Sequence, residues 1–168
     1  MAALSLDIRP ELPADAAAIE RLHERAFGPG RFARTAFRVR EGTQPYRPAC
    51  FVAFVATLIV GSVRVSPANA GGAKVLMLGP LTVDPAFEGR GVGSMLMRAS
   101  IDGAKDAGES LIYLVGDEPY YSRFGFKRAP AKGAALPGPV DPARFLVLEL
   151  KDGALAGVTG VMQPLRLV

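Results

Sequence analysis

A strand, a glycine-rich loop, a helix and a second strand follow one another in the middle of this chain, and this order constrains the fold most. The run "KVLMLGPLTV" at 74–83 is typical of a buried strand but is interrupted by Gly79 and Pro80. Proline cannot donate to a strand ladder, so this strand must bulge or splay there and leave backbone groups free. A helix is expected over about 91–107 and an apolar strand over 111–116. Such a crossover implies parallel strand pairing somewhere in the sheet.

The loop before this helix carries three glycines at alternate positions, Gly89, Gly91 and Gly93. Glycines let backbone amides approach a ligand, and a helix start presents free N–H groups, so the loop is a candidate phosphate site. The dinucleotide fingerprint would need glycine where Ser94 stands, and the sequence lacks the Gly-Lys of a Walker loop. The glycines could instead make only a tight strand-to-helix turn. The bulged strand directly upstream favours a ligand with an extended amide arm and a pyrophosphate, such as coenzyme A.

Two stretches together resemble the signatures of GNAT-type N-acetyltransferases. "LGPLTVDPAFEGRGVGSMLM" looks like the acyl-CoA-binding motif of that family, whose core is Gln/Arg-x-x-Gly-x-Gly/Ala. "LVGDEPYYSRFGF" at 114–126 is similar to the second signature, an aromatic-Tyr pair followed by Gly-Phe. The resemblance runs from about residue 4 to residue 160 and is greatest to a bacterial branch of predicted small-molecule acetyltransferases. The core here reads Glu88-Gly89-Arg90-Gly91-Val92-Gly93.

The resemblance implies which residues bind the donor and which one acts in catalysis. Tyr121 would protonate the departing thiolate, because a phenol with a pKa of about 10 is protonated at neutral pH. Tyr120 is expected to be a packing aromatic, and Asp84, Asp117 and Glu118 are expected to be turn or capping residues, so no general base is assigned. Glu88 departs from the family pattern, and its carboxylate must point away from a pyrophosphate or be offset by Arg90. The expected acetyl-CoA-binding residues are Leu81, Val83, Glu88, Gly89, Arg90, Gly91, Val92, Gly93 and Ser94.

The remaining periodicity predicts a single α/β domain over residues 1–168, and the resemblance implies that its fold is GNAT-like. We expect a mixed, mostly antiparallel sheet, splayed at its bulged central strand and flanked by helices. The chain opens with a strand followed by a helix. Further strands are expected at 4–9, 50–56, 58–66, 124–128 and 143–150, helices at 13–27, within 29–48 and at 118–123, and a turn at 66–73.

Composition excludes several other classes of protein. His23 and Cys50 are the only histidine and cysteine, which argues against an internal disulfide, a zinc site and a Ser-His-Asp hydrolase, so no metal is expected. The longest apolar run, at 50–60, is shorter than the roughly 20 residues of a membrane span. The N-terminus lacks a signal-peptide pattern, and a cytoplasmic location is expected.

The resemblance carried by these two motifs therefore implies an acyltransferase that moves an acetyl group from acetyl-CoA to a primary amine of a small molecule or peptide by direct attack. The alternative is a non-catalytic acyl-CoA-binding sensor or regulatory domain. The arginine cluster at 31–40 is more typical of a solvated face than of a nucleic-acid arm, and it could also line a site for an acidic substrate. The sequence identifies neither the acceptor nor the acyl length, and the oligomeric state stays open, a homodimer included.

Overall fold

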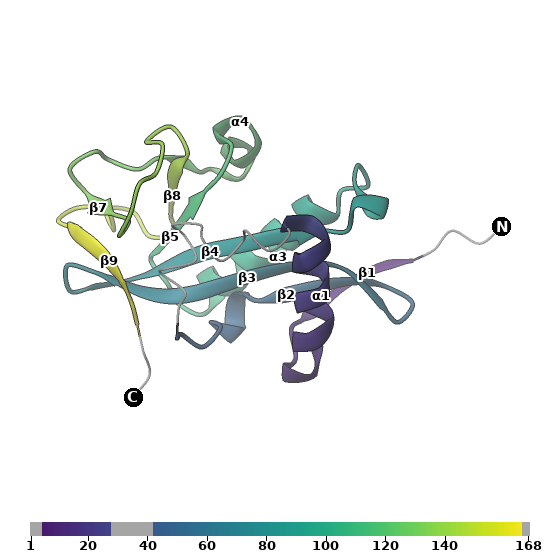
Figure 1. Ribbon diagram of the computed structural model, residues 1–168. Coiled ribbons are helices and arrows are strands. Elements are labelled where there is room, and N and C mark those ends of the chain that lie inside the picture. Colours follow the sequence, from purple (N-terminus) through teal and green to yellow (C-terminus); the bar gives the residue numbers. More distant parts are fainter. Residues whose placement is uncertain (1–4, 28–41, 166–168) are drawn as a thin grey trace.

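The computed structural model describes residues 5–27 and 42–165, which form a nine-stranded sheet with α1 on one face and α3 on the other (Figure 1). The strands are β1 (Leu6–Pro10), β2 (Phe51–Val55), β3 (Leu58–Ala70), β4 (Ala73–Val83), β5 (Leu111–Val115), β6 (Lys127–Arg128), β7 (Ala134–Ala135), β8 (Phe145–Glu149) and β9 (Gly160–Pro164). The helices are α1 (Ala16–Phe27), α3 (Val92–Asp106) and α4 (Glu118–Tyr121). Short 3₁₀ turns lie at η1 (Pro13–Asp15), η3 (Arg47–Ala49), η4 (Pro85–Phe87) and η5 (Ser122–Phe124).

The strand order is β1-β2-β3-β4-β5-β8-β6, with β9 pairing with both β3 and β7. Strands β4 and β5 are parallel and are joined through α3, which confirms the predicted crossover. Strands β7 and β9 are also parallel, and every other pair within the described residues is antiparallel. The predicted mixed and mostly antiparallel sheet with flanking helices is confirmed.

Both long helices are held to the sheet by buried apolar side chains. On α1, Ile19 and Leu22 are fully buried, and on α3 the side chains of Leu96 and Met97 are fully buried. Gly61 of β3 faces α3, and a Cβ there would come within 2.8 Å of a Val92 methyl. This close packing fixes the N-terminal end of α3 against the sheet, so the loop before it has a rigid base.

The expected turn at 66–73 is wrong in its extent, because β3 continues to Ala70 and only Gly71 and Gly72 make the turn. Both glycines have positive φ, as a two-residue hairpin turn requires, and Asn69 Oδ1 accepts a hydrogen bond from the Gly72 N–H at 2.8 Å. Pro67 lies within the strand opposite Leu76. Pairing over the whole hairpin outweighs the local turn propensity of these residues.

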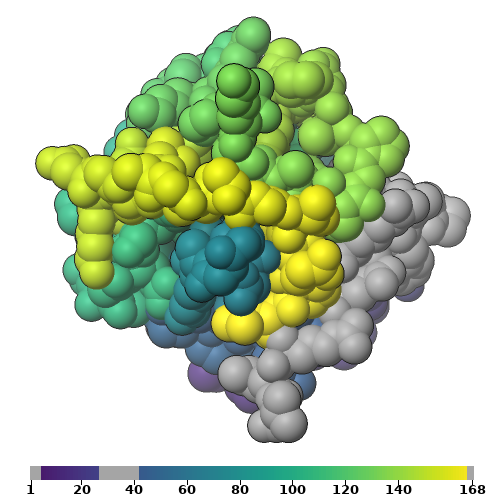
Figure 2. Space-filling model, turned by 90° about the vertical axis from the view of Figure 1, so that its left-hand side faces the viewer, coloured from purple at the N-terminus to yellow at the C-terminus, as the bar shows by residue number. Residues whose placement is uncertain are grey.

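The end of the chain forms a strand that the sequence did not predict. Strand β9 pairs with β3 over Ala68–Ala70, on the edge that β2 leaves open. Figure 2 shows the tip of the β3–β4 hairpin, in teal, bordered by this yellow C-terminal segment. Gly71 contacts the carbonyl oxygen of Thr159, a position where a Cβ has no room.

The other expectations are met in part. The predicted helix at 118–123 is found as α4 followed by η5, and the strand expected at 124–128 is reduced to β6. Of the helix and loop expected within 29–48, residues 29–41 lie outside the described residues, as does the arginine cluster at 31–40. From Gly42 to Pro48 the described chain contains only the start of η3 as regular structure.

Candidate active site

Strand β4 is open along one edge over its last residues. Its described pairing with β5 consists of Leu76 opposite Ile112 and Met77 opposite Tyr113. The pairing with β3 continues, but it shifts register at the Gly79-Pro80 step, where the two residues stand opposite Arg64 alone. The predicted bulge and splay are therefore present, and they leave residues 79–83 with β3 as their only described strand partner.

The backbone groups of Leu81 and Val83 point toward this open edge. The Asp84 N–H donates to the Val60 carbonyl of β3 at 2.8 Å, so the Asp84 amide faces β3. Successive amides along a strand point in opposite directions, and those of Leu81 and Val83 consequently face away from β3. A ligand with amide groups along an extended arm can pair with this edge as an added strand would.

The loop after β4 leads directly into the start of α3. Asp84 Oδ1 accepts a hydrogen bond from the Ala86 N–H at 3.0 Å, as expected of a turn residue, and opens η4. Gly89 and Gly91 have φ of 75° and 78°, the left-handed region that favours glycine. Gly91 is the N-cap of α3, and no side chain of the described residues caps the first turn. The N–H groups there are available to an anion.

Gly93 is required for a different reason, because it lies within the helix and packs against Tyr120. A Cβ at Gly93 would lie 2.8 Å from the Tyr120 hydroxyl oxygen. Tyr120 therefore reaches the first turn of α3, and Arg123 stacks on its ring at 4.6 Å from the centroid. The sequence predicts that Tyr120 is a packing aromatic, but it contains no pattern that predicts this contact with the glycine loop.

Tyr121 occupies the position next to this contact. Its ring packs directly on Gly116 at the end of β5, and it meets Tyr120 edge to face with centroids 4.9 Å apart. Burial, together with the nearby Tyr120 and Asp117, raises the pKa of Tyr121 to about 12. The phenol is thus protonated throughout the neutral range and is a proton donor there.

The acidic residues beside Tyr121 are held by arginines. Asp117 accepts a hydrogen bond from Arg144, and Glu118 accepts one from Arg128 at 3.3 Å. The sequence predicts turn or capping roles for both carboxylates, and the structure instead pairs each with an arginine; the side chain of Asp117, the N-cap residue of α4, makes no capping hydrogen bond. The third acidic residue considered, Asp84, also forms an ion pair at 3.1 Å with Arg25 of α1.

The side chains of Glu88 and Arg90 both lie on the exposed surface of the loop. Arg90 stacks on the Phe87 ring at 5.4 Å from its centroid, and it forms no ion pair with Glu88 among the described residues. The loop therefore presents mainly backbone amides to a ligand, and its charged side chains remain solvated. Val92, the first residue of α3, is buried, and Ser94 lies in the first turn of the helix.

Neither His23 nor Cys50 contributes to this arrangement. His23 is buried on α1, as expected of a structural histidine. Burial raises the pKa of the Cys50 thiol to about 11, which keeps it protonated and unreactive at neutral pH. Within residues 5–27 and 42–165, no group of three or more His, Cys, Asp or Glu side chains is arranged to hold a metal ion. No helix among them is long and apolar enough to cross a membrane.

Several known proteins are similar to this chain in sequence and in fold. The family described as "Acetyltransferase (GNAT) domain" matches residues 47–128. The uncharacterized N-acetyltransferase YhbS of Escherichia coli K12 is 32% identical over 162 residues, which cover 93% of this chain and 94% of that protein.

Two similar solved structures contain CoA or acetyl-CoA. The structure of YhbS from E. coli in complex with CoA superposes with a TM-score of 0.82 at 31% identity and covers 98% of this chain and 92% of that one. A GNAT family acetyltransferase from Brucella melitensis, in complex with acetyl-CoA, gives a TM-score of 0.70 at 29% identity and covers 96% of each chain. The chain therefore belongs to the GNAT family of acetyltransferases.

Proposed function

We propose that this chain transfers the acetyl group of acetyl-CoA to a primary amine of a small molecule or peptide by direct attack. One observation carries the proposal: Tyr120 packs on Gly93, in the uncapped first turn of α3 that follows the open strand edge, and it meets the ring of Tyr121 edge to face. The two similar structures solved with CoA and with acetyl-CoA support the same donor. Residues 1–168 would act as one domain.

The donor would be held mainly by backbone groups. Its pyrophosphate would accept hydrogen bonds from the amides of residues 89–94, where the start of α3 favours negative charge. Its amide-containing arm would pair with Leu81 and Val83 along the open edge of β4. An N–H on that edge would also stabilise the thioester oxygen as negative charge develops on it. Because these contacts use amides, the unusual Glu88 does not remove them.

In the transfer step, the amine nitrogen bonds to the thioester carbon and the carbon–sulfur bond breaks. The sulfur leaves with the bonding electron pair and takes the proton of Tyr121, so CoA departs as a thiol. The attacking nitrogen loses one proton to solvent, and a proton from solvent then restores the tyrosine. The high pKa of Tyr121 keeps the proton on the phenol until thiolate charge develops.

The proposal specifies the acceptor only as an amine. A cytoplasmic location and a homodimer remain predictions. Because Asp117 and Glu118 are engaged with arginines, we propose that the amine loses its proton to water rather than to one of these carboxylates.

The test is thiol release from acetyl-CoA with a broad panel of amines, for the native protein and for Tyr121→Phe. We expect turnover of at least one amine, and a rate lowered about a hundredfold or more in the variant, with CoA binding retained in calorimetry. The matched control is Tyr46→Phe. The Tyr46 hydroxyl donates a hydrogen bond to Glu109 at 2.9 Å, and Glu109 lies beyond the C-terminal end of α3, away from the loop. The control should keep the native rate.

Each other result has a definite meaning. If both proteins bind CoA and no amine is acetylated, the chain is an acyl-CoA-binding sensor. If Tyr121→Phe and Tyr46→Phe lose activity equally, Tyr121 is not the acid. If CoA does not bind at all, the account of the glycine loop is wrong.

A further inference from the structure

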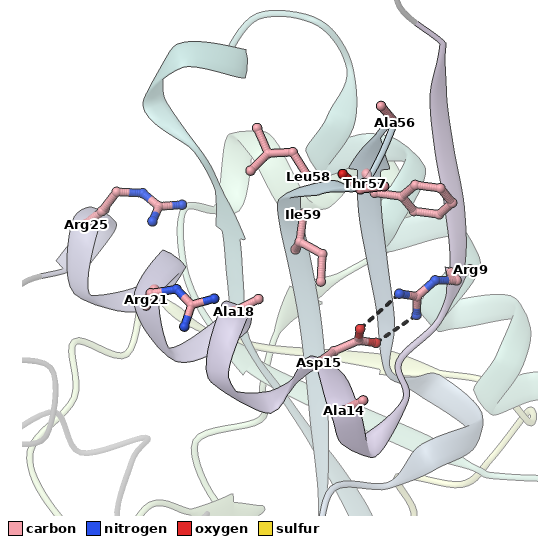
Figure 3. A pocket seen from close by; sticks show the side chains of 11 residues that line it. Arg9, Ala14, Asp15, Ala18, Arg21, Arg25, Ala56, Thr57, Leu58 and Ile59 are labelled. Carbon is pink, nitrogen blue, oxygen red and sulfur yellow. Dashed lines mark hydrogen bonds and ion pairs between the residues drawn. The ribbon is translucent and has the colours of Figure 1, made fainter.

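A second concave site lies between α1 and the β2–β3 hairpin, apart from the glycine loop (Figure 3). Its volume is about 510 Å³, within the range of pockets that hold small molecules. One wall is a stripe of α1 that contains Arg21 and Arg25, and the other is the hairpin with Leu58 and Ile59. We propose that this pocket binds a small organic anion, a carboxylate or a phosphate monoester that also carries an apolar group.

The floor of the pocket is an ion pair that is already complete. Arg9 donates two hydrogen bonds to the Asp15 carboxylate, at 2.7 and 2.9 Å. Asp15 also accepts from the Leu12 N–H at 2.8 Å, and its side chain is only 9% exposed. The charge of this carboxylate is therefore offset by Arg9, and the pair adds no net charge to the pocket.

The positive charge of the pocket comes from α1. Arg21 and Arg25 are one helical turn apart, and Figure 3 shows both guanidinium groups directed toward the hairpin side. Arg25 is paired with Asp84. Arg21 forms no hydrogen bond or ion pair with any residue in the described part of the chain. One guanidinium charge is thus left for a ligand, and its planar donors match a carboxylate or a phosphate.

The apolar requirement comes from the remaining lining. Leu58 lines the pocket and is 54% exposed, so its apolar side chain is accessible to a ligand. Phe54, Ala14 and Ala18 extend the same surface, and Arg9 stacks on the Phe54 ring at 5.4 Å from its centroid. An inorganic anion would leave this surface in water, whereas an anion with an aliphatic or aromatic group would cover it.

This inference does not depend on acetyl transfer, because none of the donor-binding residues lines the pocket. Arg25 nevertheless spans the two regions, since its partner Asp84 begins the loop that leads to α3. A variant of Arg25 would remove both a positive charge of the pocket and the ion pair with Asp84. Arg21 is exposed and lacks a described partner, so it is the residue whose substitution tests the pocket alone.

The experiment is calorimetric titration of the full chain with benzoate, phenyl phosphate and the neutral benzamide at fixed ionic strength. We expect the two anions to bind and benzamide not to bind. Arg21→Gln should weaken anion binding about ten- to a hundredfold, as expected for the loss of a charge-assisted hydrogen bond in a pocket. Lys132→Gln is the matched control, because Lys132 is an exposed cation outside the pocket and its replacement changes the net charge by the same amount.

The control should bind both anions as the native protein does. CoA affinity should be unchanged in both variants, which separates this test from the proposed acetyl transfer. The proposal is overturned if no probe binds at millimolar concentration, if benzamide binds as well as benzoate, or if Arg21→Gln and Lys132→Gln lower anion affinity equally.

Discussion

The glycine loop and the α1 pocket are both proposed to bind an anionic group, but they use different parts of the chain to do so. The loop offers backbone amides from one continuous segment, residues 81–94, next to the start of α3. The pocket offers guanidinium groups and apolar side chains that β1, α1 and the β2–β3 hairpin bring together. A backbone site can be recognised in the sequence by the spacing of its glycines. A pocket of side chains that the fold brings together has no such local pattern. Substitutions should therefore act on the two regions independently.

The largest effect is expected from Gly93→Val, which tests the backbone site. The new side chain would collide with the Tyr120 hydroxyl, so we expect a stability loss of about 1–3 kcal/mol. Because it also crowds the amides at the start of α3, CoA affinity should fall at least about tenfold in calorimetry.

Gly108→Ala is the control for that experiment, at the opposite end of the same helix. Gly108 has a φ of 85° with open space around it, so the substitution should cost about 1 kcal/mol through backbone strain alone. CoA affinity should stay at the native value. Equal losses of affinity in the two variants would show that the loop responds to general destabilisation, and the contact with Tyr120 would then be irrelevant to the donor.

Asp15→Asn should produce the next largest effect, and it acts on the pocket region only. It removes the carboxylate that holds Arg9 and the Leu12 N–H, so thermal or urea unfolding should show a loss of about 1–3 kcal/mol. The hydrogen bond from Arg9 lowers the pKa of Asp15, so this stabilisation is present above the ordinary pKa of about 4 and is lost as pH falls below it. The variant should lack that share of acid sensitivity and bind CoA normally.

A smaller effect concerns the response of Tyr121 to alkali. Its folded pKa is about 12, against about 10 for an unfolded tyrosine, so its contribution to stability is complete below pH about 10 and is lost between the two values. Tyr121→Phe should flatten this part of the profile of unfolding free energy against pH. Tyr46→Phe should flatten it too, since burial and Glu109 raise that pKa to about 12 as well. A Tyr121→Phe profile identical to the native one would contradict the burial of the phenol.

The smallest effect is expected from Arg25→Gln, which cuts the link between the two regions. The side chains of Arg25 and Asp84 are 48% and 17% exposed, so the pair should be worth less than about 1 kcal/mol. Asp84 keeps its hydrogen bond from the Ala86 N–H, and CoA affinity should change less than about twofold. A much larger change, measured by calorimetry, would mean that the two regions are coupled.

The same contrast explains which features could be predicted from the sequence. Gly79-Pro80, Gly89 and Gly91 impose local backbone conformations, so the bulge, the loop and the crossover through α3 were predictable. The turn at 66–73 was placed too broadly because its extent depends on pairing with β4 and β9, which local propensity does not encode.

The candidate site divides in the same way. The family motifs located the loop and Tyr121, because each is a short local pattern. The contact of Tyr120 with Gly93, the ion pair of Arg25 with Asp84 and the α1 pocket join residues that are far apart in sequence. The hydrophobic periodicity of residues 13–27 predicts the apolar face of α1. It does not predict that Arg21 and Arg25 on the same helix line a pocket with the β2–β3 hairpin.

The most direct test of the central claim is to follow the backbone amide resonances of isotopically labelled protein during titration with CoA. We expect the largest shifts at Leu81, Val83 and the amides of residues 89–94, with small shifts at Arg21 and at the β2–β3 hairpin. If the largest shifts occur in the α1 pocket, or if the open edge of β4 and the start of α3 do not respond, the donor does not bind where this account places it.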